Sequence, residues 1–185
     1  SLDGSKFFYE NPLESRGDHH RWDWHACPCC PPNIARLTAS IGSYIYGQAE
    51  SALAVHLYCQ SKGVFDVSGG RVTLEQETNY PWDGTVAIRV GVDRAGPFTL
   101  SARIPGWSVG ATATLNGEPV DVAANVRDGY LALTRQWKDG DIMVLDIPLE
   151  PRVMWPHPEI RQDAGRIALA RGPLVYCLEG VDNGF

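Results

Sequence analysis

The chain is organised around one stretch, Trp24-His25-Ala26-Cys27-Pro28-Cys29-Cys30-Pro31-Pro32-Asn33, which holds three of its five cysteines. The stretch leads directly into a helical pattern, in which apolar residues recur on one face of a 3.6-residue period. Two prolines are tolerated at its start, because the first N–H groups of a helix have no partners inside it. We therefore predict a helix from these prolines to a stop at Gly47, with an apolar face made of Ile34, Leu37, Ile41, Tyr44 and Ile45.

Beyond residue 50 the period of the apolar residues changes to two, which is typical of strands with one buried face. Turn signals separate the alternating runs, and Asn116-Gly117 and Asp139-Gly140 are strong tight-turn signals. Many short strands at this spacing predict a mainly β chain folded as a β-sandwich or jelly roll. The predicted strands cover residues 53–59, 72–74, 86–92, 98–104, 130–135, 141–149, 165–171 and 173–179.

These patterns divide the chain into three parts. Residues 1–48 hold the cysteine stretch and the helix, and residues 49–150 form a β-sandwich domain. Residues 151–185 supply further sandwich strands or the start of a second sandwich. Four prolines between positions 148 and 158 mark the joint. Because the chain starts at Ser1 without an initiator methionine, we expect it to be a piece of a longer protein.

Composition excludes some partners. The net charge is −6 and no basic run is present, which argues against nucleic acid and anionic membranes as partners. No apolar run approaches the length of a membrane span. A secreted disulfide scaffold has an even, spread-out set of cysteines, whereas these are crowded. Crowding favours metal binding or a reactive thiol in a reducing compartment, so the cytoplasm is favoured, although the compartment of the longer protein is left open.

The cysteine stretch has three interpretations on spacing alone: a structural metal site, a reactive thiol, or inert packing. Structural zinc sites use C-x₂₋₄-C pairs, whereas the spacing here is C-x-C-C. Cys29 and Cys30 lie just before a predicted helix N-terminus, where unpaired N–H groups and the helix dipole lower the pKa of a thiol. This position favours a reactive thiol. Cys59 and Cys177 lie inside apolar strand patterns, and we predict that both are small buried core residues.

The cysteine stretch resembles the CCPPN motif of the β-L-arabinofuranosidases of glycoside hydrolase family 127, through Cys29-Cys30-Pro31-Pro32-Asn33-Ile34-Ala35-Arg36. Further segments that fit the family follow in order at residues 7–15, 103–107, 116–120, 163–169 and 171–177. The resemblance implies an (α/α)6-barrel catalytic domain followed by β-sandwich domains. This chain would then hold the last segment of the barrel, with one helix, and the sandwich region.

The resemblance also implies a function, namely a zinc-dependent retaining glycoside hydrolase whose carbohydrate substrates are β-L-arabinofuranosides or related plant sugars. It makes Cys29 the nucleophile and Cys30 a ligand of Zn²⁺, with Cys29 also in contact with the ion, and leaves the role of Cys27 open. It places the glutamate acid/base and the other zinc ligands upstream of this chain. We therefore expect the chain alone to be inactive. The apolar face of the truncated barrel should be exposed unless it pairs with another copy, which makes a homo-oligomer a candidate.

Other polar and aromatic residues allow two interpretations each. His19, His20, Trp24 and His25 are candidates for lining the sugar pocket, and the alternatives are solvated histidines and a tryptophan packed on the barrel wall. A second candidate function is a non-catalytic sandwich that binds carbohydrate or supports assembly, with the cysteines in a structural metal site. Scattered tryptophans motivate it, but core or domain-interface packing is their favoured interpretation; they are Trp82, Trp107, Trp137 and Trp155.

Overall fold

The structure, a computed structural model, describes residues 1, 3–10, 15–94, 96–178 and 180–184. The chain divides into two compact units, Ser1–Tyr44 and Ile45–Phe185. Regular structure in the described part of the first unit consists of α1 (Cys30–Ser40), the 3₁₀ turn η1 (Ile41–Tyr44) and one antiparallel bridge between Phe7 and Trp22.

Helix α1 begins where the sequence predicts and ends earlier than predicted. Its first turn contains the two prolines, and at Ile41 it gives way to η1. Gly47, the predicted stop, lies instead in strand β1 (Tyr46–Ala49). A Cβ atom at Gly47 would lie 2.5 Å from Nε2 of His56, which follows strand β2 (Ala52–Val55). Glycine is needed here for close side-chain approach rather than for helix termination.

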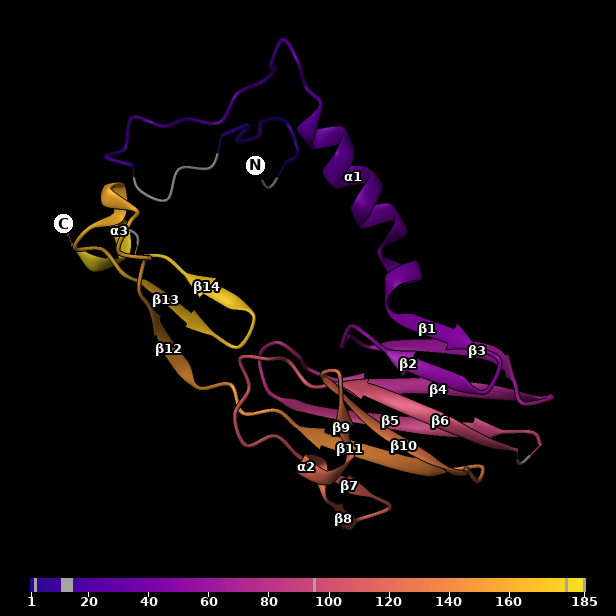
Figure 1. The fold of residues 1–185 in the computed structure, drawn as a ribbon. Coiled ribbons are helices and arrows are strands. Elements are labelled where there is room, and N and C mark those ends of the chain that lie inside the picture. Colours follow the sequence, from indigo (N-terminus) through magenta and orange to yellow (C-terminus); the bar gives the residue numbers. More distant parts are fainter. Residues whose placement is uncertain (2, 11–14, 95, 179, 185) are drawn as a thin grey trace. The chain divides into compact units, whose positions relative to one another are not determined.

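Ile45–Phe185 contains two large sheets, which Figure 1 shows as stacked layers. One sheet has the strand order β1-β2-β6-β10-β9, and the other has the order β3-β4-β5-β11-β7-β8. All neighbours run antiparallel except β2 and β6, which run parallel. The remaining elements are β3 (Ser61–Val67), β4 (Gly70–Thr78), β5 (Thr85–Val92), β6 (Pro97–Arg103), β7 (Thr112–Leu115), β8 (Glu118–Val120), α2 (Val122–Asn125), β9 (Val126–Arg127), β10 (Tyr130–Gln136) and β11 (Asp141–Asp146).

One hydrophobic core joins the two sheets. Leu53, Leu100 and Leu131 belong to the first sheet and are at most 1% exposed. They share a single cluster with buried residues of the second sheet, such as Ile88 and Leu145. Alternate residues of β5 and β6 point into this cluster, as the period of two predicts. The predicted mainly β fold is therefore confirmed, and two sheets packed on one core form a sandwich.

The tight turn at Asn116-Gly117 is also present. It joins β7 to β8, and the φ angles of its two residues are +54° and +86°. Two successive positive φ angles define the type I′ hairpin turn, which asparagine followed by glycine adopts with little strain.

A third, smaller sheet follows the prolines, with the order β12-β13-β14. Cys177 follows this sheet and is exposed, so the prediction that it is a buried core residue is wrong. The reason is that β14 ends before Cys177, and Val175 and Leu178 on either side of it are 74% and 70% exposed. Cys59, in the sandwich, is half-buried. The elements of this region are β12 (Pro151–Met154), η2 (Arg161–Asp163), β13 (Ala168–Arg171), β14 (Leu174–Tyr176) and α3 (Gly180–Asn183).

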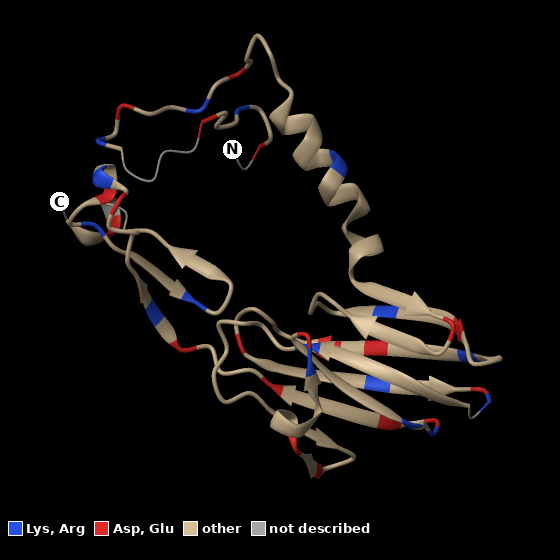
Figure 2. Cartoon of the chain, viewed as in Figure 1, with Lys and Arg blue, Asp and Glu red and all other residues tan. Residues whose placement is uncertain are grey.

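The apolar face of α1 is exposed, as expected. Ile34, Leu37 and Ile41 are 65%, 52% and 45% exposed, and no residue of the helix is buried. Arg36 is its one charged residue, and the rest of the helix is tan in Figure 2. Homo-oligomer formation through this face stays a prediction. Within the part of the chain that the structure describes, no helix is both long and apolar enough to cross a lipid bilayer.

Candidate active site

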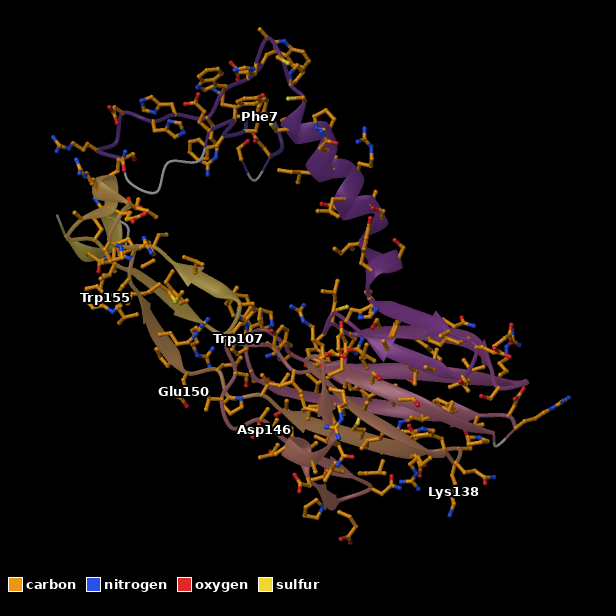
Figure 3. All side chains as sticks on the ribbon, viewed as in Figure 1. Phe7, Trp107, Lys138, Asp146, Glu150 and Trp155 are labelled. Atoms are coloured by element: carbon orange, nitrogen blue, oxygen red, sulfur yellow. The ribbon has the colours of Figure 1, made fainter. Side chains whose placement is uncertain are left out.

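A backbone bridge joins Phe7 to Trp22, which lies shortly before the cysteines in the sequence. The N–H of Phe7 donates to the carbonyl of Trp22 at 3.0 Å, and the N–H of Trp22 donates to that of Phe7 at 2.8 Å. Phe7 is labelled in Figure 3. The bridge joins the segment that contains Tyr9 to the segment that leads into the cysteines.

The backbone of the cysteine turn is held at both ends. The N–H of Cys29 donates to the carbonyl of Cys27 at 2.9 Å, and the Nδ2 group of Asn33 donates to the carbonyl of Cys29 at 2.8 Å. Arg36 in turn donates to Oδ1 of Asn33 at 2.6 Å. Cys29 already has helical dihedral angles as the N-cap residue of α1. The Cys29 side chain therefore projects from a fixed turn rather than from a free loop.

The Tyr9 hydroxyl lies within hydrogen-bond distance of the Cys29 thiol. Its oxygen, Oη, lies 3.3 Å from Sγ of Cys29. The Tyr9 ring stacks on His25 with a centroid separation of 3.8 Å and an interplanar angle of 2°, and His25 stacks on Trp22 at 5.1 Å and 17°. The N–H of Cys27 donates to Nδ1 of His25 at 3.2 Å. Sequence reasoning missed Tyr9, because no spacing rule connects it to a cysteine twenty positions away.

The two groups shift each other's pKa in opposite directions. The Tyr9 hydroxyl, followed by the Cys30 thiol, lowers the pKa of the Cys29 thiol through hydrogen bonding. The Cys29 sulfur raises the pKa of Tyr9 above its ordinary value. Both directions mean that Cys29 ionises first while Tyr9 keeps its proton and donates it. Pro31 and Pro32 have no N–H, so the backbone donors expected at the helix N-terminus contribute less than the sequence argument assumes.

The sulfur atoms of Cys29 and Cys30 fit two positions of a tetrahedral zinc site. They lie 3.8 Å apart, and two thiolates bound at about 2.3 Å to one tetrahedral ion are separated by about 3.8 Å. Among the described residues, no group of three or more histidine, cysteine, aspartate or glutamate side chains could hold a metal ion. The described residues thus offer a pair of sulfur ligands, and a complete site needs further donors.

The structure brings only some of the predicted pocket residues to the cysteines. His25 belongs to the aromatic stack beside Cys29. His19 lies in a neighbouring cluster, where its Nε2 is 2.7 Å from the carbonyl of Glu10 and its ring stacks on Phe8 at 5.0 Å. His20 and Trp24 are exposed, and within the described residues neither has a ring stack or hydrogen bond to a cysteine.

The tryptophans of the sandwich do not form one binding face. Trp137 is fully buried, and its Nε1–H donates to the carbonyl of Phe98 at 3.0 Å. Trp107 is half-buried, and the Arg152 guanidinium lies 5.4 Å from its ring centroid. Only Trp82 and Trp155 are largely exposed, at 63% and 75%. Figure 3 labels Trp107 and Trp155, which follow different strands. The favoured interpretation, packing, therefore holds for Trp137.

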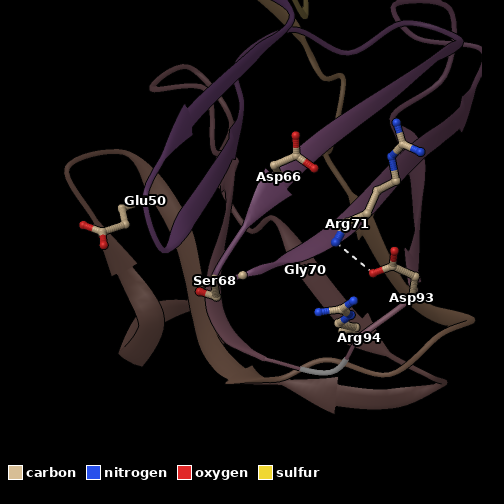
Figure 4. Close-up of a pocket in the computed structure, with 8 residues that line it drawn as sticks. Glu50, Asp66, Ser68, Gly70, Arg71, Asp93 and Arg94 are labelled. Atoms are coloured by element: carbon tan, nitrogen blue, oxygen red, sulfur yellow. Dashed lines mark hydrogen bonds between the residues drawn. The ribbon is translucent and has the colours of Figure 1, made fainter.

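A depression of about 740 Å³ lies at the turns that end β3 and β5. Figure 4 shows its charged lining, which includes Asp66, Arg71, Asp93 and Arg94. Oδ1 of Asp93 accepts a hydrogen bond from the backbone N–H of Arg71 at 2.8 Å. The Asp93 carboxylate therefore stabilises the local backbone. The lining contains no cysteine, histidine or aromatic side chain. It therefore supplies neither a thiol nor an aromatic ring on which a sugar could stack.

Comparisons with known proteins match all three parts of the chain to one family. Residues 1–43 match the description "Beta-L-arabinofuranosidase, GH127 catalytic domain". Residues 52–149, more than half of the chain, match "Beta-L-arabinofuranosidase, GH127 middle domain". Residues 151–185 match "Glycoside hydrolase family 127 C-terminal domain".

Individual relatives agree with these matches. A non-reducing end β-L-arabinofuranosidase of Bifidobacterium longum subsp. longum is 38% identical over 200 residues, which cover 99% of this chain and 30% of that protein. The crystal structure of Ara127N-Se, a GH127 β-L-arabinofuranosidase from Geobacillus stearothermophilus T6, is 50% identical with a TM-score of 0.92 and covers 100% of this chain and 31% of that one. A second GH127 β-arabinofuranosidase structure is 36% identical with a TM-score of 0.89, over 98% of this chain and 31% of the other. The chain therefore spans about a third of the length of these relatives.

Proposed function

Because the chain belongs to glycoside hydrolase family 127, we propose that it supplies the nucleophile of a retaining glycoside hydrolase. The substrates would be β-L-arabinofuranosides or related plant sugars, in keeping with the names of its relatives. One observation carries the proposal. Cys29 projects from the fixed turn before α1, within 3.3 Å of a hydroxyl that lowers the pKa of its thiol. A thiolate is the nucleophilic form of cysteine.

The proposed reaction has two displacements. First, the Cys29 thiolate attacks the anomeric carbon, a carbon–sulfur bond forms, and the bond to the departing oxygen breaks as that oxygen takes a proton from an acid group. Second, water attacks the same carbon and gives a proton to the same group, now a base. The carbon–sulfur bond breaks, and its electron pair returns to sulfur. Two inversions at one carbon give net retention of configuration.

We propose that Cys29 and Cys30 also hold Zn²⁺, in keeping with the 3.8 Å separation of their sulfur atoms. When bound, the ion supplies positive charge that keeps the thiol deprotonated at neutral pH. The remaining ligands and the acid group would come from segments of the longer protein. We expect these 185 residues by themselves to show no measurable hydrolysis of a nitrophenyl β-L-arabinofuranoside.

Serine and alanine variants of Cys29 in the longer, zinc-loaded protein test the proposal. Cys29→Ser and Cys29→Ala should each lower kcat by about a thousandfold or more, since the nucleophile is lost. Cys30→Ser should lower zinc content as well as activity, measured by metal analysis of the purified protein. Cys177→Ser is the matched control, because it removes an exposed thiol of the other unit, and it should leave kcat within about twofold.

A covalent label distinguishes the nucleophile from a metal ligand. An electrophilic probe with the arabinofuranose configuration should add one sugar-sized mass to Cys29, located by fragmentation of the peptide that contains it. Hydrolysis at the wild-type rate by Cys29→Ala, or a label on another residue, would remove the assignment. Retained activity in a zinc-free protein would instead remove only the metal part of the proposal.

A further inference from the structure

The environment of Cys29 raises the question of what holds its sulfur in place. Two of the residues that follow it, Pro31 and Pro32, have no N–H to donate. The N–H of Cys29 itself is used by the carbonyl of Cys27. A sulfur on an exposed side chain can rotate about χ1 unless a partner fixes it. The Tyr9 hydroxyl, at 3.3 Å, is the oxygen partner that the described residues provide for this sulfur.

We propose that Tyr9 is a positioning residue for Cys29 and that a stacked column of Tyr9, His25 and Trp22 holds it there. The inference rests on the proposed function, since it gives the hydroxyl a task only if Cys29 reacts. Tyr9 touches the sulfur through its hydroxyl, whereas His25 and Trp22 act through Tyr9.

Each ring of the column is fixed by a contact of its own. Trp22 is held by its two backbone hydrogen bonds to Phe7. His25 accepts a hydrogen bond on Nδ1 from the N–H of Cys27, which sets the orientation of the imidazole ring. Tyr9 lies on His25 with nearly parallel planes, 2° apart. A donor that is preorganised in this way costs little reorganisation when charge appears on the sulfur.

The chemistry indicates which step gains most from the hydroxyl. In the first displacement the sulfur loses negative charge as it bonds to carbon, so a hydrogen bond to the thiolate orients the nucleophile but also reduces its reactivity. In the second displacement the carbon–sulfur electron pair returns to sulfur. A hydroxyl that donates to the departing thiolate stabilises it, and thiols with a lower pKa leave faster. Removal of the hydroxyl should therefore slow the second step more than the first.

Tyr9→Phe in the longer, zinc-loaded protein tests this directly, because it keeps the stacked ring and removes only the oxygen. We expect kcat to fall by about 10- to 100-fold, the effect of losing one hydrogen bond to a charged group. The value of kcat/KM should fall less than kcat, so KM should drop. Intact-protein mass spectrometry during turnover should show a sugar adduct accumulating on Cys29. Tyr44→Phe, the same change at the far end of the helical segment, should behave as wild type.

Two variants of His25 test the column. His25→Phe keeps a flat ring under Tyr9 and should retain more of kcat than His25→Ala, which removes the stack. A residue that binds the sugar would respond differently, since loss of a substrate contact raises KM in both variants. A pair of equal kcat values for His25→Phe and His25→Ala contradicts the column.

A measurement without substrate separates this inference from the proposed function. The rate at which iodoacetamide alkylates Cys29 should differ several-fold between chelator-treated Tyr9→Phe and chelator-treated wild type, because the hydroxyl that lies 3.3 Å from the sulfur is removed. If Tyr9→Phe equals wild type in kcat and in alkylation while Cys29→Ser is inactive, the inference is overturned and the proposed function stands. If Cys29→Ser remains active, the proposed function fails, and alkylation still decides whether Tyr9 holds the thiolate.

Discussion

Leu37 and Leu100 have the same side chain but differ in their exposure to solvent. Leu37 lies on α1 and is 52% exposed, whereas Leu100 lies on β6 and is fully buried. The difference extends to whole units, since no described residue of Ser1–Tyr44 is buried, while Ile45–Phe185 contains a continuous core. An amphipathic pattern thus identifies the face that requires burial, but it does not say whether the partner of that face belongs to the same piece of chain.

The largest expected effect comes from separating the two regions. A piece covering residues 45–150 should fold alone and unfold cooperatively in urea, because it holds both sheets of the sandwich. A piece covering residues 1–44 should give the circular dichroism of a mostly unfolded chain, since one short helix without packing is marginal in water. A cooperative transition in the smaller piece contradicts this contrast.

Identical leucine substitutions should give the next largest effect. In these 185 residues, Leu100→Ala should lower the free energy of unfolding by about 2–5 kcal/mol, because it empties space in the core. Leu37→Ala should change it by less than about 0.5 kcal/mol, as expected of an exposed site. In the longer protein, where we expect other segments to cover α1, both variants should be destabilising. The measurement is urea unfolding followed by tryptophan fluorescence.

Two aspartates give a smaller, pH-dependent contrast. Burial alone raises the pKa of Asp141, but hydrogen bonds from the N–H of Lys138 and from Asn116, with the Arg135 charge, lower it overall. A depressed pKa contributes stability that is present above about pH 4 and is lost as the pH falls through the folded-state pKa. Asp141→Asn should therefore be less stable than wild type at pH 7, and the difference should shrink as the pH falls below about 4.

Asp3 supplies the control for that experiment. Hydrogen bonds from Ser1 and Ser5 lower its pKa to about 2. It is fully exposed and belongs to the unit without a core, so Asp3→Asn should leave the urea midpoint of the sandwich unchanged at every pH. If Asp3→Asn shifted the urea midpoint with pH as much as Asp141→Asn does, the presence of a core would not explain the difference in stability between the two regions.

The smallest effects should come from exposed ion pairs, one in each region. Nζ of Lys6 lies 3.5 Å from Asp23, and Nζ of Lys62 lies 3.7 Å from Glu75. Such pairs are screened by water and contribute about 0–1 kcal/mol. Lys6→Met and Lys62→Met should each shift the unfolding free energy by less than about 0.5 kcal/mol. A larger loss for Lys62 would show that surface charge helps to distinguish the sandwich.

Local rules predicted the parts of the fold that depend on local chemistry. The alternation at residues 98–104 corresponds to β6, and Asn116-Gly117 makes the predicted hairpin. Strand β3 was not predicted, because its inward positions include Ser61 and Gly63, which do not look apolar. A Cβ atom at Gly63 would lie 2.5 Å from the Phe65 ring, so glycine here makes room for an aromatic side chain. Such packing depends on neighbours that a period cannot reveal.

The candidate site was predictable to a similar degree. The cysteine motif and the start of α1 indicated Cys29 and Cys30 as the reactive pair, and their roles stay a proposal. Tyr9 was not foreseen, because it lies twenty positions before Cys29, and contacts between residues distant in the sequence leave no local pattern. The prediction that Cys177 is buried was wrong. An apolar strand pattern implies that another element packs on the strand, and the residues around Cys177 are exposed instead.

The parallel pairing of β2 with β6 has a consequence for the order in which segments can pair during synthesis. Strand β2 pairs with β6, and Ala52 of β2 lies opposite Thr99, which is more than forty residues later in the sequence. During synthesis from the N-terminus, Leu53 and Val55 therefore leave the ribosome well before the strand that will bury them. The segment that contains Cys29 therefore leaves the ribosome before the sandwich that follows it can close.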